Sequence, residues 1–269
     1  MAGRQEYVPD RRTVLRGAVL VAGGLLLGGP AGLPGPASAA VIPRVYTREE
    51  WKARSPRHTI QVLDRGPTHI VVHHTATQNS YDTSAEHAGE LSRIIQSYHM
   101  DSNGWSDAGQ QLTISRGGHV MEGRDRTIQA IREGRHVIGA HTADHNSHTI
   151  GIENEGTYAT VAPPAELMTS LVETCAWLCL VYRLHPEEAI VGHRDFNSTS
   201  CPGDKLYSML PKLRDDVTAR LRKQLDHLSE PAGTELSLEQ LPDHPPRPAS
   251  ERVANFYHGP AIGERDTSL

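Results

Sequence analysis

Two side chains of zinc-binding type lie close together in the C-terminal half of the sequence. His193 and Cys201 stand eight positions apart in a run of turn-forming residues, and an imidazole nitrogen and a thiolate sulfur are both common zinc ligands. The apolar segment 189–191 predicts a strand that ends just before His193. The loop that follows can fold back and bring Cys201 towards it. Packing does not explain a thiol at Cys201, because its neighbours are Ser, Pro and Gly.

A third candidate ligand lies far upstream. The β-branched run 70–72 predicts a central strand, and His73 and His74 follow it directly. A lone histidine at a strand end is more often a core residue than a ligand, so this assignment depends on the loop that carries His193 and Cys201. Three protein ligands with a fourth position open are typical of a catalytic zinc site. We therefore predict a Zn²⁺ centre assembled from two distant parts of the chain.

The composition excludes several classes of function. The chain has 269 residues, a formal net charge of −5, 22% charged and 37% hydrophobic residues, which is typical of a globular protein with one sizeable core. The sequence has no dense run of Lys and Arg, so it gives no indication of a nucleic-acid partner. We expect the protein to be a monomer. Three cysteines are too few, and odd in number, for a disulfide framework. Cys175 and Cys179 lie one helical turn apart in a periodic segment, so we expect them in the core.

The two ends of the chain differ from its middle. Arg11 and Arg12, the apolar run 17–29 and an A-x-A cleavage site at 37–39 predict a twin-arginine export signal over residues 1–39. The apolar run is too short to span a membrane comfortably, although an N-terminal anchor helix is the alternative. We therefore expect a secreted protein with no stable membrane span. The proline-rich, polar tail 226–269 is expected to be disordered.

The middle of the chain, residues 40–225, is expected to form one domain. Hydrophobic periodicity predicts the following elements: strands at 68–73, 149–155 and 190–191, a hairpin of 111–115 with 119–122, a capped helical start at 47–51, and helices at 84–100, 165–183 and 204–224. In the helix 84–100, Leu91, Ile94, Ile95 and Tyr98 fall on one face. Strands and helices interleave around one hairpin. The pattern predicts an α/β fold with a mixed central β-sheet flanked by helices.

Five motifs occur in an order and spacing that are similar to one protein family. They are Val-Val-His-His-Thr-Ala at 71–76, Gly-Trp-Ser-Asp-Ala-Gly at 104–109, Gly-Ala-His-Thr at 139–142, Ile-Gly-Ile-Glu-Asn-Glu-Gly at 150–156, and the run 192–204 that ends in Cys-Pro-Gly-Asp. The chain resembles the family of peptidoglycan recognition proteins and zinc-dependent N-acetylmuramoyl-L-alanine amidases across roughly residues 45–221. One motif alone is weak, whereas five in order are specific.

This resemblance implies a zinc ion held by His73, His193 and Cys201, with His74 beside the site. It implies peptidoglycan or muropeptides as the substrate, cleaved at the amide between N-acetylmuramic acid and L-alanine. Thr199 matches a family position occupied by Lys or Thr, whose role is to steady the oxyanion. A simple turn residue is an equal alternative at this position.

The resemblance also implies a substrate groove. Trp105, His141 and Asn146 are the candidates to line it, and each is as readily a structural residue as a binding residue.

One position departs from the pattern of the family. Many members carry a tyrosine directly after the Trp-Ser-Asp-x-Gly run, and here that position is Gln110, which cannot act as a general base. In other branches of the zinc amidases the Ile-Gly-Ile-Glu run supplies the catalytic base, which implies Glu153. We expect Glu153 to take a proton from the attacking water and pass it to the leaving amine. Glu155 points to the same face of the strand and competes for this role.

Three alternatives stay open. The first is a peptidoglycan-binding recognition module with little or no turnover, which Gln110 favours and the retained Cys201 disfavours. The second is a zinc hydrolase of another amide or of soluble muropeptides. The third is a structural protein of the cell wall, for which the tail is the one hint.

Overall fold

A six-stranded mixed sheet organises the domain, as the sequence predicts. The computed structural model describes residues 42–229, with side chains as far as residue 224, and these residues belong to one unit. The strand order is β1-β5-β4-β7-β3-β8, and β4 and β5 are the antiparallel hairpin among parallel neighbours. The strands are β1 (Val45–Tyr46), β3 (His69–His74), β4 (Leu112–Ile114), β5 (Val120–Glu122), β7 (Thr149–Asn154) and β8 (Ile190–Gly192).

The remaining elements surround this sheet. A second, two-stranded antiparallel sheet, which the sequence does not predict, pairs β2 (Val62–Leu63) with β6 (His136–Val137). The helices are α2 (Ala85–Ser97), a π-helix η2 (Tyr98–Ser102), α3 (Thr127–Arg132), α4 (Ala165–Tyr182), α5 (Pro186–Ala189), a 3₁₀ helix η3 (His193–Asp195), α6 (Asp204–Ser208) and α7 (Leu210–Ser229).

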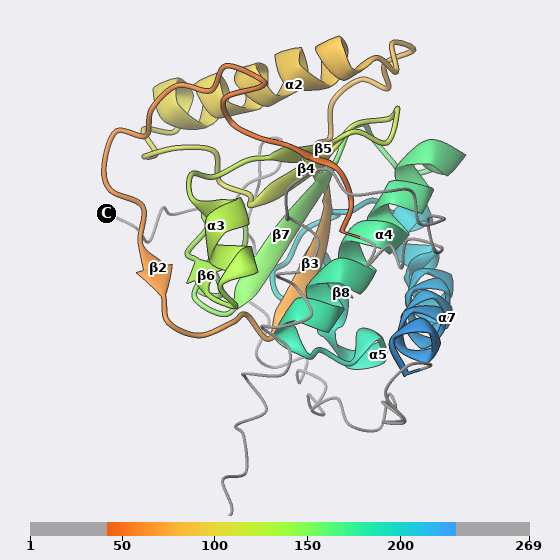
Figure 1. Ribbon diagram of the computed structural model, residues 1–269. Helices are drawn as coiled ribbons and strands as arrows, with labels where there is room; N and C mark the ends of the chain where they lie inside the picture. Colours follow the sequence, from red (N-terminus) through yellow and green to blue (C-terminus); the bar gives the residue numbers. More distant parts are fainter. Residues whose placement is uncertain (1–41, 230–269) are drawn as a thin grey trace, which may run out of the picture. The chain divides into compact units, whose positions relative to one another are not determined.

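One face of the sheet is covered by α4 and α7, which lie side by side (Figure 1). Ile70 and Val72 of β3 point to this face and pack in the main hydrophobic core. In α4, Leu171, Cys175 and Cys179 are fully buried in the same core. By length and hydropathy α4 is apolar enough to cross a membrane. Its buried contacts with the sheet explain that composition, because a central core helix is apolar for the same reason.

The opposite face of the sheet carries polar side chains. Because successive residues of a strand point to opposite faces, His73 points away from the core that holds Val72. His73 is paired in register with Glu153 of β7, and Glu153 is paired with Thr113 of β4. These three side chains therefore share one floor, formed by β3, β7 and β4.

Helix α2 covers the hairpin end of this second face (Figure 1). Its N-terminus is where the sequence predicts it, since the hydroxyl of Ser84 accepts a hydrogen bond from the amide of His87 at 3.1 Å. Its buried stripe contains Leu91 and Ile95, whereas Ile94 is 59% exposed. The prediction that Ile94 shares the buried face is wrong, because the sheet contacts only the neighbouring stripe of the helix.

Two predicted helices also differ from the structure. Thr47–Trp51 forms a turn, although Glu50 accepts a hydrogen bond from the Thr47 amide at 2.7 Å. Lys52 follows with a φ of 59°, which ends the turn before a helix can propagate. Trp51 joins this segment to the hairpin, since its indole donates to the Glu122 carbonyl at 2.8 Å. The predicted helix 204–224 is two helices, α6 and α7, which are divided at Met209.

The predicted export signal, residues 1–39, lies outside the described residues, and so does the tail from residue 230 onward. Both assignments therefore stay predictions. Helix α7 continues to Ser229, four residues beyond the end of the domain predicted at residue 225.

Candidate metal centre

The structure brings together the three ligand-type side chains that the sequence separates. His73 lies near the end of β3, and His193 directly follows β8, which is the parallel neighbour of β3. His73, His193 and Cys201 offer nitrogen and sulfur atoms within 4.8 Å of one another, and all three side chains are buried. The Cys201 Sγ lies 3.7 Å from the His73 Nδ1. The predicted ligand set is thus preassembled.

The loop between His193 and Cys201 folds back as predicted. The carbonyl of Cys201 accepts hydrogen bonds from the amide of Arg194 at 3.1 Å and from its Nε at 3.4 Å. The guanidinium of Arg194 also lies over the ring of Tyr207, 4.7 Å from its centroid, and pairs with Asp204 at 2.7 Å. Through these contacts Arg194 holds the backbone of Cys201 in place.

The electrostatics of this cluster fit a bound cation. Burial raises the pKa of the Cys201 thiol, and the nearby Glu153 carboxylate raises it further. The backbone amide of His74 donates to the Cys201 Sγ at 3.5 Å, which favours the thiolate. Buried charges are stable when they are paired or coordinate a metal. Two imidazoles and a thiolate beside a carboxylate therefore suit a divalent metal that prefers nitrogen and sulfur.

The one distance printed between two ligand atoms is compatible with zinc. Zinc bonds of about 2.0–2.3 Å in a tetrahedral arrangement place ligand atoms roughly 3.3–3.8 Å apart. The 3.7 Å between the Cys201 Sγ and the His73 Nδ1 falls in that range.

The carboxyl group of Glu153 lies beside the first of these ligand-type side chains, His73. Its Oε1 lies 3.7 Å from the His73 Nδ1, its side chain is fully buried, and neither of its oxygens has a hydrogen-bond partner among the described residues. Burial raises the pKa of Glu153 well above its ordinary value. A buried carboxyl group with a raised pKa and free oxygen atoms can exchange a proton with a bound molecule.

The competing candidate, Glu155, is fully engaged in hydrogen bonds. One of its oxygens pairs with the His87 Nε2 at 2.7 Å, and the other accepts from the Arg116 amide at 2.7 Å. Glu155 therefore holds α2 and the hairpin turn at the end of β7. Of the two carboxylates, the geometry favours Glu153 as the proton carrier.

The side chain of Gln110 reaches the same floor through Thr113. Its side chain is buried, and its Nε2 donates to the Thr113 hydroxyl at 2.8 Å. Thr113 is the residue that pairs with Glu153 across β4 and β7. Of the side chains on this floor, His73 and Glu153 are titratable, whereas the Gln110 amide and the Thr113 hydroxyl are not.

Thr199 and His74 support the cluster from two sides. The hydroxyl of Thr199 accepts a hydrogen bond from the Cys201 amide at 3.1 Å, while its own proton stays available for donation. His74 points to the other face of β3, where its Nδ1 accepts from the Tyr158 amide at 3.2 Å. Burial, together with the charge of Arg194, lowers the pKa of His74 to about 4. His74 is therefore a neutral, structural neighbour of the ligands.

The three residues expected to line a groove are buried inside the domain. Trp105 packs against His99 with ring centroids 4.9 Å apart. His141 lies behind the first ligand, with its Nδ1 3.0 Å from the His73 Nε2. Asn146 accepts hydrogen bonds from two backbone amides of the same loop. Direct contact of these residues with substrate stays a prediction.

Sequence reasoning missed Asn197, whose Oδ1 lies 3.1 Å from the His193 Nε2. The one available signal is its position four residues after His193, in a loop rich in polar turn formers. Such a residue is indistinguishable in sequence from a solvent-exposed turn residue.

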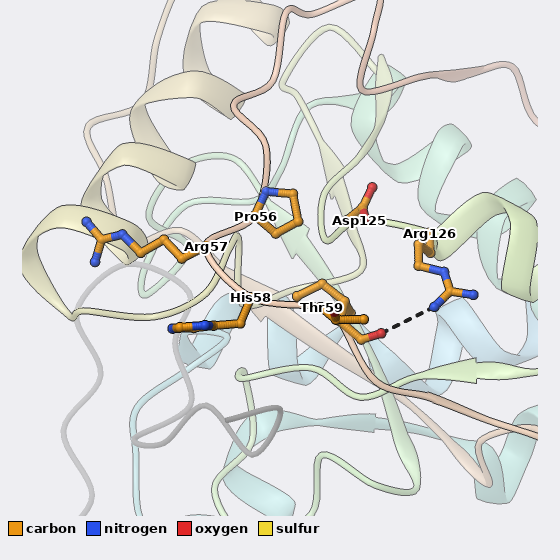
Figure 2. A pocket seen from close by; sticks show the side chains of 7 residues that line it. Pro56, Arg57, His58, Thr59, Asp125 and Arg126 are labelled. Atoms are coloured by element: carbon orange, nitrogen blue, oxygen red, sulfur yellow. Dashed lines mark hydrogen bonds between the residues drawn. The ribbon is translucent and has the colours of Figure 1, made fainter.

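A separate, open hollow of about 800 Å³ lies away from this chemistry. It is lined by Pro56–Ile60 together with Asp125 and Arg126, and none of these is a candidate site residue. Figure 2 shows the side chains of Arg57 and His58 pointing to one side and that of Arg126 to the other, where it donates to the Ile60 carbonyl at 3.5 Å.

Comparison with known proteins identifies the family. The family profile described as N-acetylmuramoyl-L-alanine amidase matches residues 63–204. The chain belongs to this family. It is 34% identical to a human N-acetylmuramoyl-L-alanine amidase over 170 residues, which cover 62% of this chain and 28% of the human protein. It is also 34% identical to a peptidoglycan recognition protein of Trichoplusia ni, over 61% of this chain and 84% of that protein.

The solved structures with a similar fold include peptidoglycan recognition proteins. One is peptidoglycan recognition protein-LE in complex with tracheal cytotoxin, described as monomeric diaminopimelic acid-type peptidoglycan. It matches with a TM-score of 0.55 and 26% identity, over 62% of this chain and 92% of that chain. The chain spans less than a third of the human relative, so that protein's activity does not transfer to it without further argument.

Proposed function

We propose that this protein is a zinc-dependent hydrolase that cleaves the amide between N-acetylmuramic acid and L-alanine in peptidoglycan. One observation carries the proposal. A fully buried carboxylate, Glu153, lies 3.7 Å from the Nδ1 of His73, with no hydrogen-bond partner for its oxygens among the described residues. A recognition module needs no such group. A buried carboxyl group without a hydrogen-bond partner costs stability, and such groups are concentrated at functional sites.

His73, His193 and Cys201 would hold the metal. When bound there, zinc would supply Lewis-acid activation of water and of the amide carbonyl. Glu153 accepts the proton of the attacking water and returns it to the leaving amine of L-alanine. Burial raises the pKa of Glu153, which strengthens the side chain as a base for the proton of the attacking water. The hydroxyl of Thr199 donates to the developing oxyanion.

The substrate class follows from the relatives. They include proteins named N-acetylmuramoyl-L-alanine amidase and a recognition protein in complex with a peptidoglycan fragment. Peptidoglycan lies outside the cytoplasm, so the proposal also requires export of the chain. The predicted signal over residues 1–39 supports that requirement from sequence alone.

The second candidate is a recognition module without turnover. It is favoured by Gln110, which replaces an acidic hydroxyl on the floor of the site, and by the recognition proteins among the structural neighbours. The retained thiol of Cys201 in the ligand set argues against it.

Digestion of purified peptidoglycan separates the two candidates. The full chain is loaded with zinc, incubated with peptidoglycan, and the soluble products are identified by mass spectrometry. The amidase releases stem peptides that begin with a free L-alanine amine, and the Glu153→Gln variant releases none. Retention of peptidoglycan by zinc-loaded wild type without any released peptide would establish the recognition module instead.

A further inference from the structure

Both histidine ligands are held from behind by the same segment. We call residues 138–148, which connect β6 to β7, the support loop. The Nε2 of His73 lies 3.0 Å from the Nδ1 of His141, a residue of this loop. The Nε2 of His193 lies 3.1 Å from the Oδ1 of Asn197, and the Nδ2 of Asn197 donates to the carbonyl of Ala143 in the same loop at 3.4 Å.

The first chain of hydrogen bonds ends on a backbone carbonyl. The Nε2 of His141 lies 3.2 Å from the carbonyl oxygen of Thr149. A carbonyl oxygen only accepts, so the Nε2 of His141 carries the hydrogen. A neutral imidazole has one N–H, and the Nδ1 of His141 is therefore an acceptor. The Thr142 hydroxyl lies 2.8 Å from the same Nδ1 and, as a second donor, shares its single lone pair with His73.

The tautomer of the first ligand follows from that arrangement. Because the Nδ1 of His141 accepts, the Nε2 of His73 donates and carries the hydrogen of that ring. The lone pair of His73 then lies on its Nδ1, the atom that is 3.7 Å from the Cys201 Sγ. Which nitrogen of a histidine binds a metal is set by the hydrogen bond of the other nitrogen.

The second series of hydrogen bonds, which runs through Asn197, gives the second ligand the same tautomer. The carbonyl of Ala143 fixes the orientation of the Asn197 amide, since it accepts from the Nδ2. The Oδ1 of Asn197 then faces His193 and accepts from its Nε2. The lone pair of His193 is therefore on its Nδ1 as well.

The support loop is itself rigid. The Oδ1 of Asn146 accepts from the amides of His141 at 2.8 Å and Thr142 at 3.0 Å. The carbonyl of Asn146 lies 2.8 Å from the Nε2 of His136. Both His141 and Asn146 are almost completely buried, so little water competes for these hydrogen bonds. These hydrogen bonds to the loop involve no ligand.

We propose that the support loop presets both histidine ligands with the lone pair on Nδ1, and that His141 and Asn197 are the positioning residues that transmit this order. The proposal rests on the metal site of the proposed function. In this proposal His141 orients the ligand His73 through a hydrogen bond and does not line the substrate groove.

Zinc affinity of the full chain, measured by competition with a chelating dye, tests the proposal. Removing such a supporting hydrogen bond commonly weakens metal affinity by about 10- to 100-fold, and we expect this for His141→Leu and for Asn197→Leu. His141→Asn places an amide oxygen near the position of the lost Nδ1 and should restore most of the affinity. Thermal unfolding of the metal-free forms serves as the control for folding. Equal affinities of wild type and both leucine variants, or a His141→Asn variant as weak as His141→Leu, would overturn the proposal.

A second measurement needs no variant. Nitrogen-15 chemical shifts of the imidazoles in the metal-free full chain report the tautomer of each ring. We expect His73 and His193 to carry their hydrogens on Nε2, and hydrogens on Nδ1 in either ring would contradict the proposal. A wild type that binds zinc but releases no stem peptides would remove the amidase function and leave the positioning roles standing.

Discussion

The two faces of the central sheet use the same strands for opposite purposes. On the face covered by α4 and α7, Ile70 and Val72 of β3 pack against apolar side chains and are fully buried. On the other face, His73 and Glu153 are equally buried but polar. The first face gains stability from every contact. The second keeps a carboxyl group that lacks a hydrogen-bond partner near a buried thiol, an arrangement that costs stability.

Successive side chains of a strand point to opposite faces of the sheet, and this separates the residues that pack the core from those that form the polar site. A residue and its neighbour in β3 point to opposite sides, so His73 can be varied without touching the core that Val72 fills. The packed face gives β3, β7 and β8 a fixed register, and that register places His73 beside Glu153 and ends β8 at His193. Packing on the apolar face therefore determines where the polar side chains lie on the other face.

The largest expected effect comes from the polar face. Glu153→Gln removes the proton carrier and keeps the shape of the side chain, so activity should fall by about 10²- to 10⁴-fold. Zinc content, measured by mass spectrometry of the metal, should stay unchanged. Glu155→Gln is the matched control, because Glu155 spends both oxygens on His87 and Arg116. If Glu155→Gln abolished turnover and Glu153→Gln did not, the assignment of the base would be reversed.

A change on the apolar face should separate stability from chemistry. Leu171 of α4 is fully buried, and truncation of such a residue costs about 2–5 kcal/mol of unfolding free energy. We expect Leu171→Ala to unfold at lower denaturant concentration and to bind zinc as tightly as wild type at 20 °C or below. A folded variant with impaired zinc affinity would show that the two faces are coupled.

The pH dependence of stability should report a buried histidine outside the ligand set. Burial lowers the pKa of His136 from 6.5 to about 4. Between these two values the unfolded chain binds a proton at His136 and the folded chain does not. The free energy of unfolding is therefore unaffected by His136 above pH 6.5 and decreases as the pH falls towards 4. The loss from this one group is about 3 kcal/mol. His136→Gln can keep a donor to the Asn146 carbonyl and should show a smaller loss between pH 6.5 and 4 in chemical unfolding. Parallel curves for the two proteins would contradict this.

The smallest expected effect decides between two roles of Thr199. As an oxyanion donor, Thr199 should contribute about 10²-fold to kcat, and Thr199→Ala should lose that factor while Thr199→Ser recovers it. As a turn residue, it supports only the Cys201 amide. In that case Thr199→Ala would lower thermal stability and zinc affinity and leave the kcat of the zinc-loaded fraction unchanged.

Sequence reasoning recovered what depends on local pattern. Alternating and β-branched runs predict β3, β7 and the hairpin, and the helical period predicts α4. The metal cluster was also accessible, because His73, His193 and Cys201 each stand at the end of a predicted strand or in a turn where packing does not require them. Family resemblance selected His73 over His74, and the alternation in β3 agrees with that choice.

What sequence reasoning missed depends on how distant segments approach one another. His141 and Asn197 meet His73 and His193 only after the sheet has formed, and a hydrogen bond between loops leaves no periodic signal. Ile94 fits the apolar stripe of α2 as well as Ile95 does. The exposure of Ile94 is decided by which stripe the hairpin contacts, a tertiary fact that helical periodicity does not contain.

The most direct test of the account is to locate the metal. Crystals of the zinc-loaded chain, measured at the zinc absorption edge, should give one anomalous peak in the described domain. We predict that it is bonded to the Nδ1 atoms of His73 and His193 and to the Sγ of Cys201, with Glu153 close by and not a ligand. A peak elsewhere, or none beside Cys201 in protein that contains stoichiometric zinc, would contradict the assignment of the polar face as a metal-dependent catalytic site.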